Sequence, residues 1–461
     1  MPGKRNKIIA KLLPKPRVAA MTENEPSNTC SQSYNVTPFV ISCTDVCPCN
    51  ESINMDHRRP TQDSREEILM HVLKPALHFT ALSGQEFYPS CYLSKHQKNL
   101  FKVFKSIVLL FYIWNIIRLC ISFNIWLNKG TAVVYFNFFL FYFIEISKHC
   151  MKFIFNIVYS KKLLEKFTTY DVSLSEQNYF KKLKMEIKLM IGFSTIIIIV
   201  NILNIVTSTD VPFTMRTLQF VPKWRNRIFE MINFGILSWF IASGIFSDVV
   251  LLYFFVKIIC CELHALSQKL KLLDDKEQTT SDIDSKLIHL QKKYDGIMEL
   301  LHQVNTYFSI YIVTLLVFTI IFSCMLIVIS FRDDAVMREK AVSVMIAALH
   351  IALAITVLYS GISLQVAVEE PVEYLYRLSL NKEHSQDTMT RISLFFARVS
   401  NPSYLTAAKM FNIDSSTILM ISGTLLSYGV IVFQTSSVHT GDKNASMTVL
   451  TGNMTGNATF G

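Results

Sequence analysis

Long runs of apolar residues alternate along the chain with shorter charged stretches. A helix needs roughly 20 apolar residues, each rising about 1.5 Å, to cross the hydrocarbon core of a bilayer. The pattern therefore predicts an all-α membrane protein with seven transmembrane helices. The predicted spans are residues 106–126, 131–151, 189–208, 229–256, 307–331, 341–364 and 415–436.

The stretch between the fourth and fifth spans has a second pattern. Its apolar residues recur at spacings of three and four, which places them on one face of a helix. They are Leu263, Leu266, Leu270 and Leu273, then Leu287, Leu290, Ile297, Leu300, Leu301 and Val304. The polar residues 274–285 between the two sets indicate a turn. We therefore expect helical extensions of the spans that form an anchor region; the alternative is a solvated loop with some helix.

The composition agrees with a membrane protein and argues against a nucleic-acid partner. Hydrophobic residues make up 51% of the chain and charged residues 17%, with a net charge of +10. The basic residues stand between the apolar runs, as in membrane proteins, rather than in one patch. The first 60 residues are rich in Pro, Ser, Asn and Thr, which predicts disorder there.

The basic residues also predict the orientation. If the N-terminus is cytosolic, the inner segments hold 35 of the 45 Lys and Arg residues, in agreement with the positive-inside rule. The C-terminus then lies outside, where the tail offers glycosylation acceptors at Asn444, Asn453 and Asn457. Two more acceptors, Asn35 and Asn50, would be silent in the cytosol.

These patterns divide the chain into consecutive segments. They are a disordered cytosolic N-terminus (1–60), a helix before the first span (61–105), the first four transmembrane helices (106–256), a cytosolic helical anchor (257–306), the fifth and sixth transmembrane helices (307–364), a cytosolic anchor segment (365–413), the last helix (414–436) and an extracellular tail (437–461).

Charged residues inside spans are costly and are candidates for function. Arg118 lies in the first predicted span and Glu145 in the second. Because a short loop joins the two spans, an Arg118–Glu145 pair is one interpretation. The other is that Glu145 belongs to the inner interface together with Lys148.

The last span carries a motif. The chain reads Phe411-Asn-Ile-Asp414, and the apolar helix that follows ends in Ser427-Tyr428, five further residues, then Gln434-Thr435. This resembles the signature of the insect gustatory receptors, a family related to the insect odorant receptors, whose final helix carries Thr-Tyr, five apolar residues and Gln-Phe. Ser427 and Thr435 depart from that pattern.

The resemblance implies a chemoreceptor in the plasma membrane of sensory neurons. It would be a ligand-gated, non-selective cation channel that a tastant opens, leading to acceptance or avoidance. Such receptors are homo- or hetero-tetramers whose last helices line a central pore. Gln434, Phe433 and Thr435 would then lie near the outer constriction, where amides replace part of an ion's hydration shell.

The helical period refines this expectation. Ser427 precedes Gln434 by seven residues and shares its face, whereas Tyr428 is offset by about 100° and is better placed to brace the helix against its own subunit. The alternative for Gln434 is an ordinary polar residue at the membrane–water boundary.

A ligand pocket is implied among the outer halves of the second to sixth spans. The polar and aromatic residues there are Tyr135, Asn137, Asn201, Asn204, Asn233, Trp239, Ser330 and His350. Hydrogen-bonding groups with aromatic surface suit a small-molecule tastant. His350 taken alone is more often a packed residue than a ligand contact.

Other functional classes fit less well. The sequence shows no phosphate loop, acid–base cluster or zinc spacing, so we expect neither an enzyme, a cofactor nor a metal. A G-protein-coupled receptor would need an outer N-terminus. A transporter would show helices broken by Gly or Pro at mid-membrane, but Pro212, Pro222, Pro371 and Pro402 lie outside the predicted spans.

Overall fold

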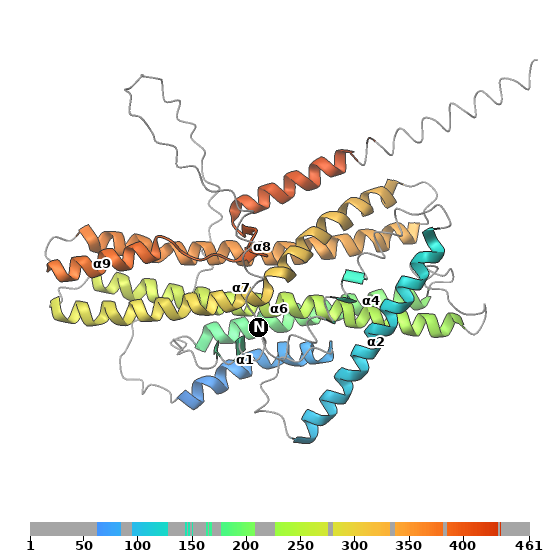
Figure 1. Cartoon of the computed structure of the whole chain (residues 1–461), viewed down its shortest axis with the longest axis horizontal. Helices are drawn as coiled ribbons and strands as arrows, with labels where there is room; N and C mark the ends of the chain where they lie inside the picture. The colour runs from blue at the N-terminus through green and yellow to red at the C-terminus, as the bar shows by residue number, and fades with distance from the viewer. Residues whose placement is uncertain are drawn as a thin grey trace, which may run out of the picture. The chain divides into compact units, whose positions relative to one another are not determined.

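The protein is described here by a computed structural model, which covers residues 62–83, 95–127, 177–207, 226–274, 280–331, 337–380 and 385–431, Gln434, and separate positions between 143 and 167. These residues are helical apart from one small hairpin and short connections (Figure 1). The elements are α1 (Gln62–Leu82), α2 (Lys95–Leu127), α4 (Gln177–Thr207), α6 (Asn226–Asp274), α7 (Thr280–Phe331), α8 (Met337–Leu380), α9 (Gln386–Val399), strands β1 (Thr406–Ala407) and β2 (Phe411–Asn412), and the last helix (Ser415–Ile431).

Four helices in the described part of the chain are long and apolar enough to cross a membrane. Their apolar stretches are Asn99–Arg118 in α2, Gly235–Leu273 in α6, Ile283–Ile321 in α7 and Ala347–Leu380 in α8. The third predicted span lies in α4, and the last helix is a shorter apolar helix. The second predicted span falls mostly outside the described residues.

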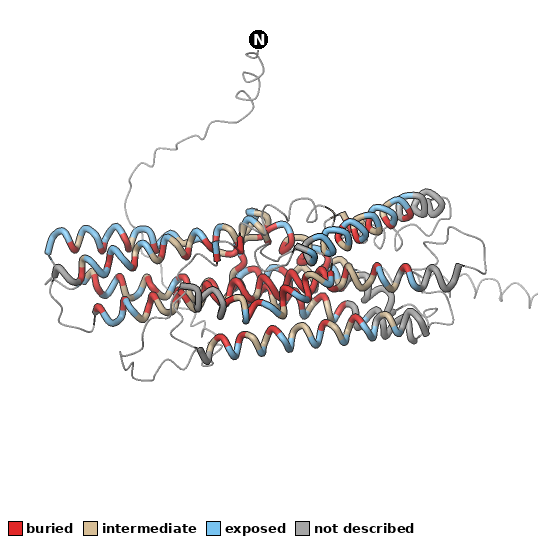
Figure 2. Tube along the Cα trace, turned by 90° about the horizontal axis from the view of Figure 1, so that it is seen from below, coloured by how far each residue is buried: buried red, intermediate tan, exposed pale blue. Residues whose placement is uncertain are grey.

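The centre of the fold is α6, which packs against α1, α4, α7 and α8 (Figure 1). Nearly every residue from 241 to 259 is buried or half-buried, including Phe254 and Phe255, which are fully buried. A helix that is apolar on all sides is expected in the interior. Figure 2 shows buried residues, coloured red, gathered in the middle of the packed helices.

The predicted helical extensions are present. Helix α6 continues to Asp274 and α7 begins at Thr280, so the turn is shorter than the polar stretch 274–285 suggested. The apolar stripe on both helices is buried: Leu263, Leu266 and Leu270 are at most 1% exposed. The alternative of a solvated loop is therefore wrong.

Two helices present apolar faces to the outside. Helix α2 exposes Leu100, Val103, Ile107, Leu110 and Trp114, and α4 exposes Leu189, Phe193, Ile196, Ile199 and Leu203. In a chain that crosses a membrane, these faces meet hydrocarbon rather than water.

Some predictions concern residues that the structure does not describe. They are the N-terminal 1–60, Glu145, Lys148, Asn35, Asn50 and the tail acceptors Asn444, Asn453 and Asn457. The helix expected before the first span is α1 together with the first turns of α2. Pro371, placed outside the sixth span, lies inside the continuous helix α8, beyond the predicted end of the span at 364.

Candidate functional site

The residues that lead into the last helix form a small antiparallel hairpin. Strand β1 pairs with β2 in the register Thr406 to Asn412 and Ala407 to Phe411. Between them, Ala408 and Lys409 have φ values of 49° and 60°. Residues other than glycine rarely adopt this left-handed backbone conformation, and it persists only where surrounding contacts impose it.

Those contacts come from α7. The Asn305 side chain accepts a hydrogen bond from the Thr406 amide at 2.9 Å and donates one to the Tyr404 carbonyl at 2.7 Å. One turn further along, the Ser309 carbonyl accepts from the Ala408 amide at 3.0 Å. Three hydrogen bonds thus attach the hairpin to the middle of α7.

The last helix begins at Asp414, which is its N-cap. The Asp414 Oδ1 atom accepts from the Thr417 amide at 2.9 Å and from the Ser416 hydroxyl at 2.6 Å. The Thr417 hydroxyl donates to the Asn412 carbonyl at 2.8 Å, which links the helix to β2. These hydrogen bonds, that from Ser416 above all, lower the pKa of Asp414. The motif Phe411-Asn-Ile-Asp414 is therefore a strand end followed by a helix cap.

Helix α8 approaches the same junction very closely. Ile413 is fully buried, and its amide donates to the Leu405 carbonyl at 2.7 Å. A Cβ atom at Gly361 of α8 would lie 2.8 Å from the Cβ atom and the carbonyl oxygen of Ile413. Only glycine allows this approach, so the start of the last helix is held between α7 and α8.

Beyond its first turn, the last helix touches its own chain along one narrow stripe. Thr417 and Ile421 are 3% and 7% exposed. Leu425 is half-buried against the core, whereas other large apolar side chains of the helix are open: Leu419 and Leu426 are 75% and 73% exposed. The single chain therefore leaves most of this helix uncovered.

The predicted pore residues lie on that uncovered surface where they are described. Ser427 and Gln434 are exposed, and Phe433 and Thr435 lie outside the described residues. Tyr428, expected to brace the helix against its own subunit, is 53% exposed. The single chain covers only about half of that side chain.

Three of the predicted ligand residues are described with their side chains, and two of them form hydrogen bonds with residues outside the predicted set. Asn233 of α6 is 5% exposed and donates to Asn115 of α2 at 3.0 Å. Trp239 is half-buried on the same helix. His350 of α8 is 7% exposed, and its carbonyl accepts from the Thr319 hydroxyl of α7 at 3.3 Å.

The remaining predicted ligand residues are less informative. Asn201, Asn204 and Ser330 lie in helices α4 and α7, but their side chains are outside what the structure describes; Tyr135 and Asn137 lie outside it entirely. A cluster of rings stands near Asn233: Phe104, Phe111 and Tyr112 of α2 surround Phe240 at centroid distances of 6.1–6.4 Å. The sequence did not indicate this cluster.

A cavity of about 550 Å³ lies elsewhere, between α8, α9 and the segment before the hairpin. It is lined by Glu369, Val372, Glu373, Tyr376, Phe396, Val399, Ser400, Pro402 and Tyr404. None of the predicted ligand residues lines it. The Tyr404 hydroxyl donates to Glu369 at 3.5 Å, and burial followed by this carboxylate raises the pKa of Tyr404.

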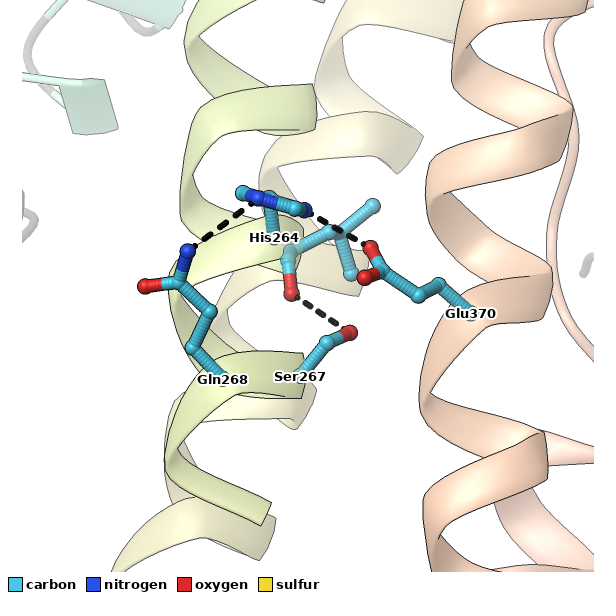
Figure 3. A network of polar contacts seen from close by, with 5 residues as sticks. His264, Ser267, Gln268 and Glu370 are labelled. Atoms are coloured by element: carbon cyan, nitrogen blue, oxygen red, sulfur yellow. Dashed lines mark hydrogen bonds and ion pairs between the residues drawn. The ribbon is translucent and has the colours of Figure 1, made fainter. Parts of the chain in front are cut away.

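Polar contacts join the helical extensions across long sequence separations. His264 Nδ1 of α6 lies 2.9 Å from Glu370 Oε2 of α8, and Gln268 lies 3.2 Å from the other ring nitrogen (Figure 3). Between α6 and α7, Glu262 and Lys293 form an ion pair at 2.7 Å, with 1% and 9% of their side chains exposed. Sequence patterns gave no signal for these pairs. In the described residues, no three His, Cys, Asp or Glu side chains gather as a metal site would require.

Comparison with known proteins gives the family. A sequence model of the 7tm Chemosensory receptor family matches residues 159–439, more than half of the chain. No curated protein matches the sequence significantly.

The fold is similar to that of the insect olfactory receptor OR5 from Machilis hrabei. Its structure in complex with eugenol gives a TM-score of 0.66 at 14% identity, and a second structure of the receptor gives 0.63 at 16%. Each alignment covers 80% of this chain and 99% of the receptor chain. The family consists of receptors rather than enzymes. The chain belongs to the 7tm chemosensory receptor family and is a multi-pass membrane protein with the fold of an insect olfactory receptor.

Proposed function

We propose that the protein is a gustatory receptor that works as a ligand-gated, non-selective cation channel in the plasma membrane of sensory neurons. Four copies, identical or mixed, would place their last helices around a common axis. The observation that carries the proposal is the state of the last helix. It is capped and attached at its first turn, yet most of its remaining surface is uncovered in the single chain. Neighbouring subunits would cover part of that surface.

The face that carries Gln434 suits a water-filled pore. At 100° per residue, Gln434, Ser427, Gly423 and Met420 fall within about 60° of one another around the helix. A Cβ atom at Gly423 would meet nothing within 4 Å. Apart from Met420, the groups on this face are small or polar and would leave room for water and ions. Amides at Gln434 would replace part of an ion's hydration shell, with Phe433 and Thr435 beside them at the constriction.

The attachment of the last helix provides a route from ligand to pore. Its first turn is bonded through the hairpin to Asn305 of α7 and packs against Gly361 of α8. A ligand that favours a different tilt of α7 or α8 would therefore reorient the start of the last helix. Such a ligand shifts the closed–open equilibrium only by its differential affinity for the two states.

We place the ligand among the polar and aromatic residues of the outer half. Asn233, Trp239 and His350 lie on α6 and α8, the helices that pack most closely at the centre of the fold. With Asn201, Asn204, Tyr135 and Asn137 they would supply hydrogen bonds and aromatic surface. Because the similar olfactory receptor was solved with eugenol, a screen includes small aromatic compounds beside sugars and bitter compounds.

Two serines on the last helix allow a matched test of the pore. Ser427 lies on the Gln434 face of the helix, whereas Ser422 lies about 140° from Ser427 around the helix axis. Both positions are exposed, and each can be replaced by cysteine. A positively charged thiol reagent applied during ligand-evoked currents is expected to block the Ser427→Cys channel and leave the Ser422→Cys channel unchanged. Equal effects on both variants, after subtraction of the wild-type response, would remove the pore assignment.

A charged substitution at Gln434 gives a second test of the pore assignment. Gln434→Glu is expected to raise the permeability of divalent relative to monovalent cations, because four carboxylates strengthen the field at the constriction. Gln434→Asn keeps the amide and serves as the control. An unchanged selectivity and conductance in a responding Gln434→Glu channel contradicts the proposal.

A further inference from the structure

The exposed face of α1 is basic. Along this helix, the exposed positions follow a spacing of three and four; His71, Lys74 and His78 occupy the first three and Leu82 the last. The positions between them, such as Leu73 and Leu77, are buried against the rest of the fold. Helix α1 thus turns its apolar side inward and a basic stripe outward.

Helix α4 continues this basic surface. Lys181, Lys182 and Lys188 are exposed, and Lys184 is half-buried. The Lys184 ammonium lies 3.0 Å and 3.1 Å from the two ring nitrogens of His71. This contact joins α4 to α1, so the lysines of α4 and Lys74 belong to one surface.

Acidic groups are few on this surface in the described parts of α1 and α4. Among the described side chains 69–83 of α1 and 179–203 of α4, Glu186 is the one carboxylate. It accepts a hydrogen bond from the Tyr253 hydroxyl at 3.0 Å, on the side of α6. The acids of α1 are Asp63, Glu66 and Glu67; Glu67 stands four residues before His71, so the stripe carries one acid at its N-terminal end. Among the described side chains of the two helices, five lysines therefore share a surface with a single carboxylate, and that carboxylate is hydrogen-bonded to α6.

The apolar face of α4 indicates where the basic surface lies relative to the membrane. Leu189 follows Lys188 directly, and Phe193, Ile196 and Leu203 continue along the same helix with 60%, 61% and 55% of their surface exposed. Those side chains meet hydrocarbon in a membrane protein. The lysines stand at the end of the hydrocarbon-facing stretch, which is where phospholipid head groups lie.

We propose that Lys74, Lys181, Lys182, Lys184 and Lys188, together with His71, form a binding surface for the head groups of anionic phospholipids. Four to eight basic residues at the end of a transmembrane helix attract anionic lipid, with a contribution of about fivefold in affinity for each residue near the surface. The surface lies on α1 and the first turns of α4, apart from the last helix; Asn201 and Asn204, the predicted ligand residues of α4, come 13 and 16 residues after Lys188. Lipid binding there is independent of the proposed channel function.

The test uses the full chain purified in a neutral detergent and titrated with dioctanoyl phosphatidylserine, dioctanoyl phosphatidylcholine or inorganic phosphate. Dissociation constants come from microscale thermophoresis. Phosphatidylserine is expected to bind at least tenfold more tightly than phosphatidylcholine. The double variant Lys181→Gln/Lys188→Gln is expected to weaken phosphatidylserine binding by about 25-fold and to leave phosphatidylcholine binding unchanged.

Two further double variants distinguish binding at this surface from a nonspecific effect of the protein's net charge. Lys181→Arg/Lys188→Arg keeps the charge and is expected to keep the affinity. Lys271→Gln/Lys292→Gln removes two exposed lysines from α6 and α7 and is expected to have no effect. Any of three results overturns the proposal. They are equal binding of the two lipids, wild-type affinity for phosphatidylserine in Lys181→Gln/Lys188→Gln, and an equal loss of affinity in both Gln variants. Displacement of phosphatidylserine by an equal concentration of inorganic phosphate would indicate a small-anion site and would contradict the proposed lipid-binding surface.

Discussion

At the residue scale, Asp414 is the side chain on which the first turn of the last helix depends. Asp414→Ala removes the acceptor of the Thr417 amide and the Ser416 hydroxyl, which costs about 1 kcal/mol in helix capping. The folded-state pKa of Asp414 is lowered. Its contribution to stability is therefore complete above the unfolded value of about 3.9 and is lost as the pH falls through the lower folded pKa.

The measurement is the unfolding temperature of the purified protein between pH 3 and pH 7. Asp414→Asn is the control, because an amide also caps a helix but does not titrate. We expect it to keep most of the stability at neutral pH and to lose the decline in acid that Asp414 causes. An Asp414→Ala protein as stable as the wild type at pH 7 would show that the cap is unimportant.

Gly361 is the second residue with a specific expectation. In Gly361→Ala the new methyl group meets the Ile413 carbonyl oxygen at 2.8 Å, and backbone cannot rotate away as a side chain can. Overpacking of this kind costs about 1–3 kcal/mol, so the unfolding temperature should fall. Gly192→Ala on α4 is the matched control, since nothing lies within 4 Å of its Cβ position and alanine favours a helix. Equal effects of both substitutions would mean that α8 and the junction are not in tight contact.

At the scale of elements, two ion pairs join the helical extensions and should differ strongly in importance. Lys293→Met leaves the Glu262 carboxylate buried without its cation, which is expected to destabilise the protein by about 3–5 kcal/mol. Arg398→Met breaks the pair with Asp295, whose side chains are about half exposed, and is expected to cost about 0–1 kcal/mol. Chemical unfolding of both variants measures the difference.

The reason for the difference can be tested with one more variant. Adding Glu262→Gln to Lys293→Met removes the buried charge and is expected to restore part of the lost stability, because an uncompensated carboxylate is the main cost. A double variant less stable than Lys293→Met alone would contradict this explanation.

The elements also show which features a sequence reveals. The stripe through Leu263 and Leu270 repeats with the period of a helix, and it is buried as predicted. The hairpin has strands of two residues, too short for an alternating pattern, and its left-handed residues are Ala408 and Lys409 rather than glycines. Its conformation comes from Asn305, about 100 residues earlier in the chain. Local sequence holds no trace of such a contact.

The candidate site was also predictable only in part. The apolar run located the last helix, and the motif around Tyr428 and Gln434 suggested its role only through a family resemblance. The roles of Gly361, as the point where α8 passes the junction, and of His264, which contacts a residue 106 positions away, depend on packing between distant segments. Neither residue stands out from its neighbours in the sequence.

At the scale of the whole molecule, the predicted orientation has a direct test. With the C-terminus outside, Asn453 is expected to carry a glycan in a eukaryotic cell, while Asn35 carries none. Treatment with a glycosidase should therefore shift the mobility of the wild type on a gel. A variant with Asn444→Gln, Asn453→Gln and Asn457→Gln should show no shift, and the Asn35→Gln/Asn50→Gln variant should behave like the wild type. A glycan at Asn35 and none at Asn453 would reverse the orientation.

Asn305 lies halfway along a helix of 52 residues, and this position has a mechanical consequence. At 1.5 Å per residue, α7 is about 78 Å long, so a rigid tilt of about 5° around its midpoint moves each end by about 3 Å in opposite directions. The point to which the hairpin is bonded would act as a fulcrum: it rotates but scarcely travels. Spin labels at the two ends of α7 would then be displaced in opposite senses, while a label beside Asn305 would stay almost still.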